Sequence, residues 1–288
     1  MGGLYLKISK LQKPAQKTSS KRISKNFLFL IKDDSVLTEP SLTRKCVAEF
    51  IGTFILVFIG AGAAATTILL ANGESSKSSF MSSGIGALGG LADWLSLGLA
   101  FAFAIAGAFY IFGHISGCHI NPAVTIALWS VKRMPGRDVG PYIVSQLAGA
   151  TVASISFVGI VGTRAATIGG SGATALFPGI SYLQGLFNEI VISFMLMLVI
   201  MALAVYERGS KPFSGLMIGL VVAAGITTTG NISGASFNPA RTFGPYVANA
   251  LFGGPNFWIQ FPIYVIGPIF GALLAAFTYT YLTEAKAD

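Results

Sequence analysis

Six long apolar stretches alternate along the chain with shorter, more polar connections. They cover approximately residues 46–71, 94–113, 139–162, 183–205, 213–230 and 258–282. Each is close to the ~20 residues that a helix needs to cross about 30 Å of hydrocarbon. The pattern therefore predicts an all-α membrane protein with six transmembrane helices.

Two shorter apolar pieces each begin inside a repeated motif. Residues 113–125 read GHISGCHINPAVT and residues 230–242 read GNISGASFNPART, which share the pattern G-x-I-S-G-x-x-x-N-P-A-x-T. The helix-compatible pieces after the motif, residues 121–131 and 238–250, are long enough for roughly half of the hydrocarbon thickness. Because Asn is a preferred N-cap and Pro is favoured at the first helical position, each Asn-Pro-Ala box predicts the start of a half-helix. The extended backbone before each box is allowed at membrane depth only where protein buries it or where it lines a wet cavity.

The spans themselves also repeat. AEFIGTF at residues 48–54 resembles NEIVISF at 188–194, and YIVSQLAG at 142–149 resembles YVIGPIFG at 264–271. With six spans, the two half-helices enter from opposite sides of the membrane. Three spans and one half-helix therefore form a unit that occurs twice, upside down, with the two half-helix N-termini facing each other at the midplane. The first unit is longer between its first span and its box, and we expect the Gly/Ser-rich residues 72–93 to form an extracellular loop there.

Composition and charge distribution exclude an ordinary soluble protein and indicate an orientation. Hydrophobic residues make up 53% of the chain and charged residues 10%, with a mean hydropathy of +0.71. The formal charge of +8 does not indicate nucleic-acid binding, because residues 1–45 alone hold ten Lys/Arg against three acids. Other basic residues gather in the loops between spans two and three and between spans four and five. Since positively charged loops stay cytoplasmic, both termini are predicted to lie in the cytoplasm.

The two Asn-Pro-Ala boxes, the Arg after the second box, and the Glu in spans one and four resemble the major intrinsic protein family of aquaporins and glycerol channels. GCHINPAVTI and ARTFGPY are most similar to the archaeal branch of that family. The resemblance implies an aquaporin-like fold with an inverted 3+3 repeat, passive transport of small neutral solutes, and a homotetramer in the plasma membrane.

The resemblance also gives the domain organisation. It covers about residues 42–284, expected to form a single channel domain with repeats at about 42–162 and 183–284. Residues 1–41 match nothing in the family core, and we expect a disordered basic cytoplasmic tail, which membrane lipid would attract. Residues 285–288 would be a short C-terminal tail.

The two boxes are expected to form the central pore constriction. Each Asn carboxamide can hold its oxygen on the N–H groups of the helix start and direct its NH2 group at the pore. Each half-helix N-terminus carries roughly +0.5 of an elementary charge, so two facing ends repel cations and orient water with its oxygen inward. The alternative is that the two boxes are ordinary Asn-Pro helix caps in loops. The duplication of the whole motif argues against that alternative. The residues concerned are Asn121, Pro122, Ala123, Asn238, Pro239 and Ala240.

Arg241 is an ionisable residue in a membrane segment and is therefore a functional candidate by default. The resemblance assigns it to an outer selectivity filter with Phe101, Ile226 and Ala235; without the resemblance, Phe101 and Ile226 would be interpreted as packing residues. Strict water channels usually have His where this chain has Ile226. Glycerol channels commonly have Asp after the filter Arg, where this chain has Thr242, and they offer two aromatic residues. We therefore expect water permeation with slower passage of glycerol or similar solutes.

The segments before the boxes are expected to present carbonyl oxygens to the pore. The residues that would provide them are Gly117, Cys118, His119, Ala235, Ser236 and Phe237. By the resemblance, Glu49 and Glu189 accept N–H donors from these segments; the alternative is a proton relay. His119 is expected to be a structural, hydrogen-bonded residue, because the chain has two His and no clustered Cys or carboxylates that would make a zinc site. No metal or cofactor is predicted.

A passive channel is favoured over two other functional classes. The spans lack the chains of ionisable groups that coupled transport usually needs. A secondary transporter shares inverted repeats and broken helices, so it is the alternative class, which a dependence of uptake on a proton gradient would reveal. An enzyme would need a nucleophile or metal constellation, and the sequence offers no catalytic residues. Within the channel class, a glycerol-selective facilitator is the alternative.

Overall fold

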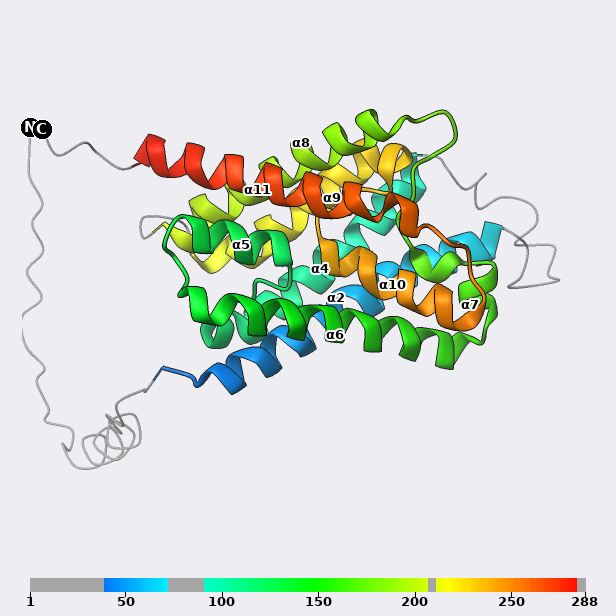
Figure 1. Ribbon diagram of the computed structural model, residues 1–288, viewed down its shortest axis with the longest axis horizontal. Coiled ribbons are helices and arrows are strands. Elements are labelled where there is room, and N and C mark those ends of the chain that lie inside the picture. The colour runs from blue at the N-terminus through cyan, green and yellow to red at the C-terminus, as the bar shows by residue number, and fades with distance from the viewer. Residues whose placement is uncertain (1–38, 72–90, 207–210, 284–288) are drawn as a thin grey trace, which may run out of the picture. The chain divides into compact units, whose positions relative to one another are not determined.

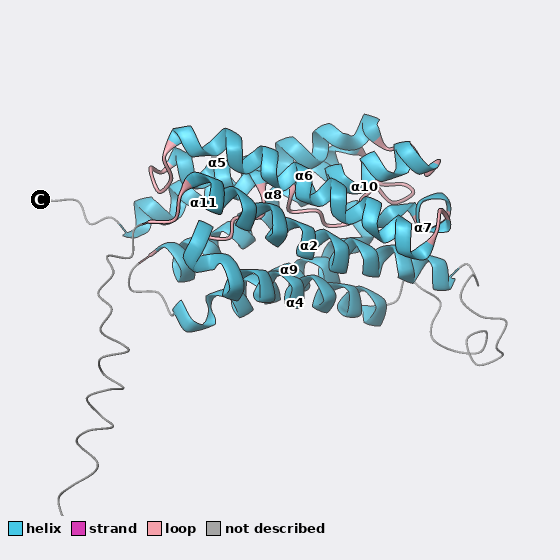
Figure 2. Cartoon of the chain, turned by 90° about the horizontal axis from the view of Figure 1, so that it is seen from below, coloured by secondary structure: helices cyan, strands magenta, loops and turns pink. Residues whose placement is uncertain are grey.

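The computed structural model describes residues 39–71, 91–206 and 211–283, and all regular secondary structure in these ranges is helical (Figures 1 and 2). Six of the helices are long and apolar enough to cross a membrane. This confirms the predicted fold class. The long helices are α2 (Leu42–Ala71), α4 (Leu91–Ser116), α6 (Gly136–Val161), α8 (Tyr182–Ile200), α9 (Ser214–Ser233) and α11 (Phe261–Thr283).

Two helices of intermediate length occupy the positions of the predicted half-helices. They are α5 (Pro122–Ser130) and α10 (Pro239–Phe252), so the first ends one residue before its predicted end and the second two residues after it. The predicted extracellular loop lies largely outside the described residues, and its last three residues belong to α4. The short elements are α7 (Arg164–Thr167), the 3-10 turns η1 (Gly170–Gly172), η3 (Lys211–Phe213) and η4 (Trp258–Gln260), and the π-helical segment η2 (Met201–Val205), which continues α8.

The long helices pack in pairs that the two repeats share. In the first repeat α2 packs against α6, and in the second α8 packs against α11, while α4 and α9 join the repeats side by side. Glycines sit at these crossings: a Cβ on Gly149 would collide with the Phe50 carbonyl oxygen, and one on Gly271 with the corresponding Ile190 oxygen. Because lipid is as apolar as a Leu side chain, helices in a membrane gain mainly from such close approach.

Each half-helix packs against the last span of the opposite repeat. The helix α5 contacts α11, and α10 contacts α6. Figure 1 shows α5 and α10 one after the other along the bundle, between α11 and α6. The two repeats are therefore interlocked, and the starts of the half-helices approach each other inside the bundle.

Candidate functional site

The two Asn-Pro-Ala boxes begin the half-helices and cap them. Asn121 has an extended backbone, and its Oδ1 accepts the Ala123 N–H at 2.9 Å. Asn238 does the same for Ala240 at 2.9 Å and for Arg241 at 3.3 Å. A cap of this kind satisfies N–H groups that have no partner inside the helix. Pro122 and Pro239 follow directly as the first helical residues, and both boxes are buried.

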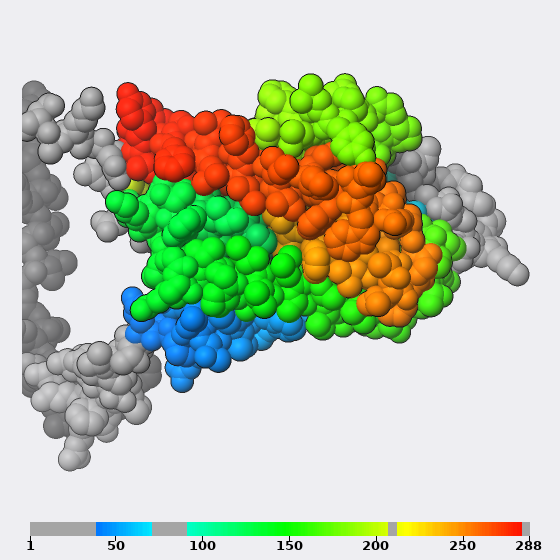
Figure 3. Space-filling model, viewed as in Figure 1, coloured from blue at the N-terminus to red at the C-terminus, as the bar shows by residue number. Residues whose placement is uncertain are grey.

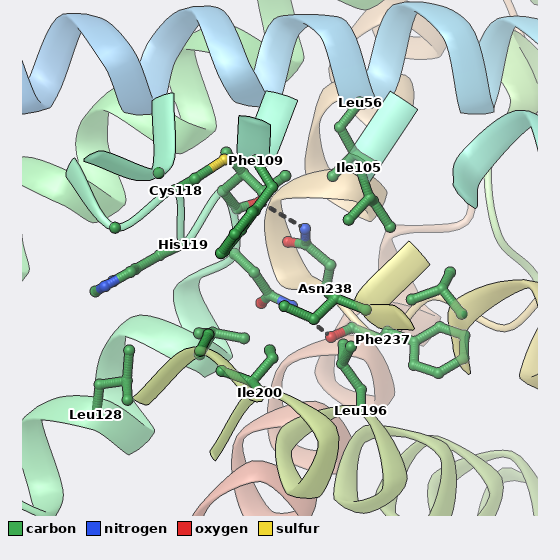
Figure 4. Close-up of a pocket in the computed structure, with 18 of the residues that line it drawn as sticks. Leu56, Ile105, Phe109, Cys118, His119, Leu128, Leu196, Ile200, Phe237 and Asn238 are labelled. Atoms are coloured by element: carbon green, nitrogen blue, oxygen red, sulfur yellow. Dashed lines mark hydrogen bonds between the residues drawn. The ribbon is translucent and has the colours of Figure 1, made fainter. Parts of the chain in front are cut away.

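The same two amides connect the repeats to each other. Asn121 Nδ2 donates to the Phe237 carbonyl oxygen at 2.9 Å, and Asn238 Nδ2 donates to the Ile120 carbonyl oxygen at 2.8 Å (Figure 4). The sequence prediction directed both NH2 groups at the pore, so it missed these two bonds. An amide has two N–H donors. Each Asn therefore uses one amide N–H to bind the opposite repeat, and this bond fixes the direction of its second N–H.

The backbone before each box has an uncommon conformation. Positive φ angles occur at corresponding places in the two repeats, namely Gly117, Cys118 and Ile120 in the first and Gly234, Ala235 and Phe237 in the second. A non-glycine residue in this region is strained and persists only where the surroundings hold it. These segments therefore need external anchors.

Glu49 is one anchor and is completely buried on α2. Its Oε1 accepts the His119 N–H at 2.8 Å and the Ser116 hydroxyl at 2.7 Å. Its Oε2 accepts the Ile120 N–H at 2.6 Å and the Gln146 amide at 2.8 Å. Four donors converge on one carboxyl group, which is a pattern typical of a structural anchor.

Glu189 occupies the corresponding place on α8 and is also completely buried. Its Oε1 accepts the Ser233 hydroxyl at 2.6 Å and the Ser236 N–H at 2.9 Å, and its Oε2 accepts the Phe237 N–H at 2.9 Å. Both carboxyl groups therefore hold the two residues directly before the box Asn, in the same way in each repeat.

Sequence reasoning missed five residues that complete these anchors: Gln146, described above, and four that repeat between the two halves. Ser116 and Ser233 are the serines of the repeated I-S-G motif, and Tyr142 and Tyr264 begin the second pair of similar segments. The Tyr142 hydroxyl donates to the Ser116 carbonyl oxygen at 2.9 Å, and Tyr264 does the same to Ser233 at 2.8 Å. Their repetition in the sequence was the available signal.

His119 and Ser236 are equivalent positions with different side chains and a shared role. His119 Nδ1 lies 3.1 Å from the Thr125 hydroxyl, and the Ser236 hydroxyl lies 2.7 Å from that of Thr242. Each contact joins the strained segment to the first turn of its half-helix. Within the described ranges no cluster of three His, Cys, Asp or Glu side chains could hold a metal ion.

A cavity of about 360 Å³ runs beside the two boxes. Asn121, Asn238 and Arg241 supply polar groups to it, and its wall is otherwise mostly apolar. Figure 4 shows Ile105, Leu196 and Ile200 around the bonds that the two amides make. Of the segments before the boxes, the cavity is lined by Gly117, Cys118, His119, Ile120, Ser236 and Phe237, and not by Ala235.

Arg241 lies between this inner cavity and an outer one of about 460 Å³, and it lines both. Its side chain is 3% exposed. Its Nη1 donates to the Gly172 carbonyl oxygen at 2.8 Å, and its Cζ lies 4.9 Å from the centre of the Phe101 ring. The Gly172 loop, which sequence reasoning did not assign, thus fixes the guanidinium.

The four predicted filter residues are all buried in the structure. Phe101, Ile226 and Ala235 belong to one cluster of packed apolar side chains. Phe101 also lines the inner cavity, whereas Ile226 and Ala235 line neither cavity. Of the four predicted filter residues, Arg241 and Phe101 therefore border a cavity, and the place of Ile226 and Ala235 in a filter stays a prediction.

Comparison with known proteins agrees with this geometry. Residues 36–279 match the family model described as major intrinsic protein. The chain is 62% identical over 244 residues to Aquaporin AqpM of Methanothermobacter marburgensis, with 85% of this chain and 99% of that protein covered. It is 57% identical over 244 residues to Probable aquaporin AqpM of Archaeoglobus fulgidus, with 85% and 98% covered.

More distant relatives also match more than four fifths of this chain. The chain is 37% identical over 237 residues to Glycerol uptake facilitator protein-like 6 of Lactiplantibacillus plantarum, with 81% of this chain and 95% of that protein covered. Its fold matches the X-ray structure of the aquaglyceroporin from Plasmodium falciparum with a TM-score of 0.69 at 24% identity, covering 83% and 96% of the two chains. The predicted resemblance, including its archaeal branch, is confirmed: the chain belongs to the major intrinsic protein family, whose members are membrane channels and not enzymes.

Proposed function

We propose that the chain is a passive channel that conducts water, passes glycerol and similarly small neutral solutes more slowly, and excludes protons and ions. The observation that carries this proposal is the pair of half-helix starts that face one cavity, each capped by an Asn whose amide is fixed by the opposite repeat.

Water would pass the boxes by accepting hydrogen bonds from the remaining N–H of each Asn amide. The positive ends of α5 and α10 favour the oxygen of that water over its hydrogens. A water molecule held in this way cannot also relay a proton to the next one in the file. Cations meet the same field and, further out, the Arg241 guanidinium.

Selectivity among neutral solutes would depend on the stretch around Arg241, which lines both cavities, if Ile226 and Ala235 face the solute there. Ile226 offers a branched alkyl group there and no hydrogen bond, which suits an alkyl backbone as well as water. Ala235 has a small side chain, so the proposed filter has one aromatic ring, that of Phe101, where glycerol channels commonly have two. The relatives are consistent with a mixed preference, since those above include proteins named as aquaporins and one named as a glycerol uptake facilitator.

Replacing Ile226 by His tests this preference. We expect glycerol flux to fall by more than water flux, because the imidazole narrows the stretch and adds a polar group that water satisfies easily. Stopped-flow light scattering on proteoliposomes with water and glycerol gradients measures both fluxes. Ile226→Leu conserves volume and should leave the ratio unchanged. If vesicles with the native chain pass glycerol no faster than protein-free vesicles, the channel is a strict water channel and the mixed preference is wrong.

We further propose that the channel is a homotetramer in the plasma membrane, with both termini cytoplasmic. The even number of spans brings the start of α2 and the end of α11 to one side. Arg44 and Lys45 at the start of α2 and the basic loop after α5 lie at that end, as the positive-inside rule requires.

A further inference from the structure

An open basic pocket lies where α5 ends and α6 begins. Its volume is about 430 Å³, and it is lined by Trp129, Lys132, Arg133, Met134, Pro135 and Gly136. Figures 1 and 3 show α5 between α6 and α11 on the face toward the viewer, with this loop at the end of the bundle where α11 finishes. We propose that the pocket binds the phosphate head group of an anionic membrane lipid.

The first support is charge complementarity. The side chains of Lys132 and Arg133 are both exposed and line the same pocket. An Arg fork and a Lys ammonium are the groups that bind phosphate oxygens most strongly. The nearby Arg137 is different, because its Nε lies 3.6 Å from Asp138 Oδ1 and its charge is partly compensated.

The second support is the depth that Trp129 indicates. Its ring is 49% exposed, and a Cβ on Gly136 would lie 3.0 Å from its Nε1, so the ring stands directly over the first residue of α6. Trp is enriched where hydrocarbon meets head groups, because its ring is apolar and its N–H is polar. The pocket therefore lies at the level of lipid phosphates, and the start of α6, which has no side-chain cap, adds a positive helix end.

The third support is the backbone of Lys132. Its φ is +59°, its N–H donates to the Trp129 carbonyl oxygen at 2.9 Å, and the Arg133 N–H donates to the Leu128 carbonyl oxygen at 2.8 Å. This is the Schellman ending of a helix, in which glycine is the usual residue at the left-handed position. A lysine there costs conformational energy that a glycine would not. A phosphate bound in the pocket would offset that cost by pairing with the Lys132 ammonium.

The pocket also adjoins the permeation path. Arg133 lines the inner cavity as well as the basic pocket. A phosphate bound to Arg133 would neutralise a cation at the edge of the pore. Lipid occupancy and the charge of this mouth are therefore coupled.

Native mass spectrometry of the full chain in neutral detergent tests the proposal. The probes are phosphatidylglycerol and phosphatidylcholine with identical acyl chains. We expect phosphatidylglycerol to bind more tightly, and the double variant Lys132→Asn/Arg133→Gln to weaken its binding roughly 30-fold if each basic residue contributes as juxtamembrane basic residues usually do. Asn tolerates the left-handed backbone, so the variant should keep its fold.

Arg137→Gln is the matched control, because it removes a nearby positive charge from the first turn of α6, outside the pocket, and it should leave the lipid preference intact. Residues 1–38 are present in every variant, so their own attraction for lipid cancels in the comparison.

Equal binding of the two lipids by the native chain would overturn the proposal. So would a double variant that loses thermal stability but keeps its lipid preference, since the two cations would then serve only the carbonyl end of α5. Tighter binding of inorganic phosphate than of phosphatidylglycerol would assign the pocket to a free anion and also overturn it.

Discussion

Replacing Glu189 by Gln is expected to destabilise the channel and to reduce its water permeability. Every partner of this carboxylate donates a hydrogen bond to it, two from the backbone of Ser236 and Phe237 and one from Ser233. An amide NH2 in place of one oxygen would face a donor inside the protein. The loss of charged hydrogen bonds and an unsatisfied buried N–H together cost about 3 kcal/mol. A drop of roughly 5 °C in the melting temperature in detergent would follow for a protein of this size.

Ser193→Ala is the matched control for that change. Ser193 lies one turn further along α8 and is 1% exposed, and its hydroxyl has no hydrogen-bond partner among the described residues. Its removal should leave stability and permeability nearly unchanged. Circular dichroism melting and stopped-flow water permeability are the two measurements. If Glu189→Gln melts and conducts like Ser193→Ala, the carboxylate does not hold the segment before Asn238.

Replacing Arg241 by Val is expected to give the channel a cation leak and a faster glycerol flux. The change removes a charge and a large side chain from the stretch between the two cavities. Two unit charges about 4 Å apart interact by about 4 kcal/mol at an effective dielectric constant of about 20, so the rejection lost corresponds to as much as about a thousandfold in cation permeability. Proton and Na⁺ fluxes in proteoliposomes, measured beside water flux, test this.

Arg241→Lys separates charge from shape. It keeps the positive charge but loses the planar group that donates to Gly172 and lies beside the Phe101 ring. It should still exclude cations while passing glycerol faster than the native chain. Retained water flux in both variants shows that they fold. If the Arg241→Val channel excludes cations as well as the native channel does, Arg241 does not contribute to ion exclusion and the half-helices alone provide it.

The parts of this fold that repeat were the parts that the sequence could predict. Six apolar runs gave six spans, because the thickness of the bilayer fixes the length of a crossing helix. The Asn-Pro-Ala boxes gave the starts of α5 and α10, because Asn and Pro have well-defined roles at a helix start. Duplication then supplied the inverted arrangement without any knowledge of contacts.

Contacts between distant segments were not predictable in the same way. The bonds from Asn121 to Phe237 and from Asn238 to Ile120 depend on how the repeats dock, which no local pattern encodes. The partner of Arg241 lies on the loop at Gly172, where the sequence has only a run of small residues. Gln146 has no counterpart in the second repeat, where Pro268 stands at the corresponding place, so duplication could not reveal its bond to Glu49.

Water conduction without proton conduction is tested most directly by one paired measurement. Purified protein in proteoliposomes that contain a pH-sensitive dye is exposed to an osmotic gradient and, separately, to a proton gradient under a clamped membrane potential. We predict water permeability well above that of protein-free vesicles and proton flux equal to theirs. Labelled glycerol added to the same vesicles should enter at a rate that does not depend on the proton gradient. Proton flux that rises in proportion to water flux would contradict exclusion at the paired half-helices, and gradient-driven uptake would indicate a transporter instead of a channel.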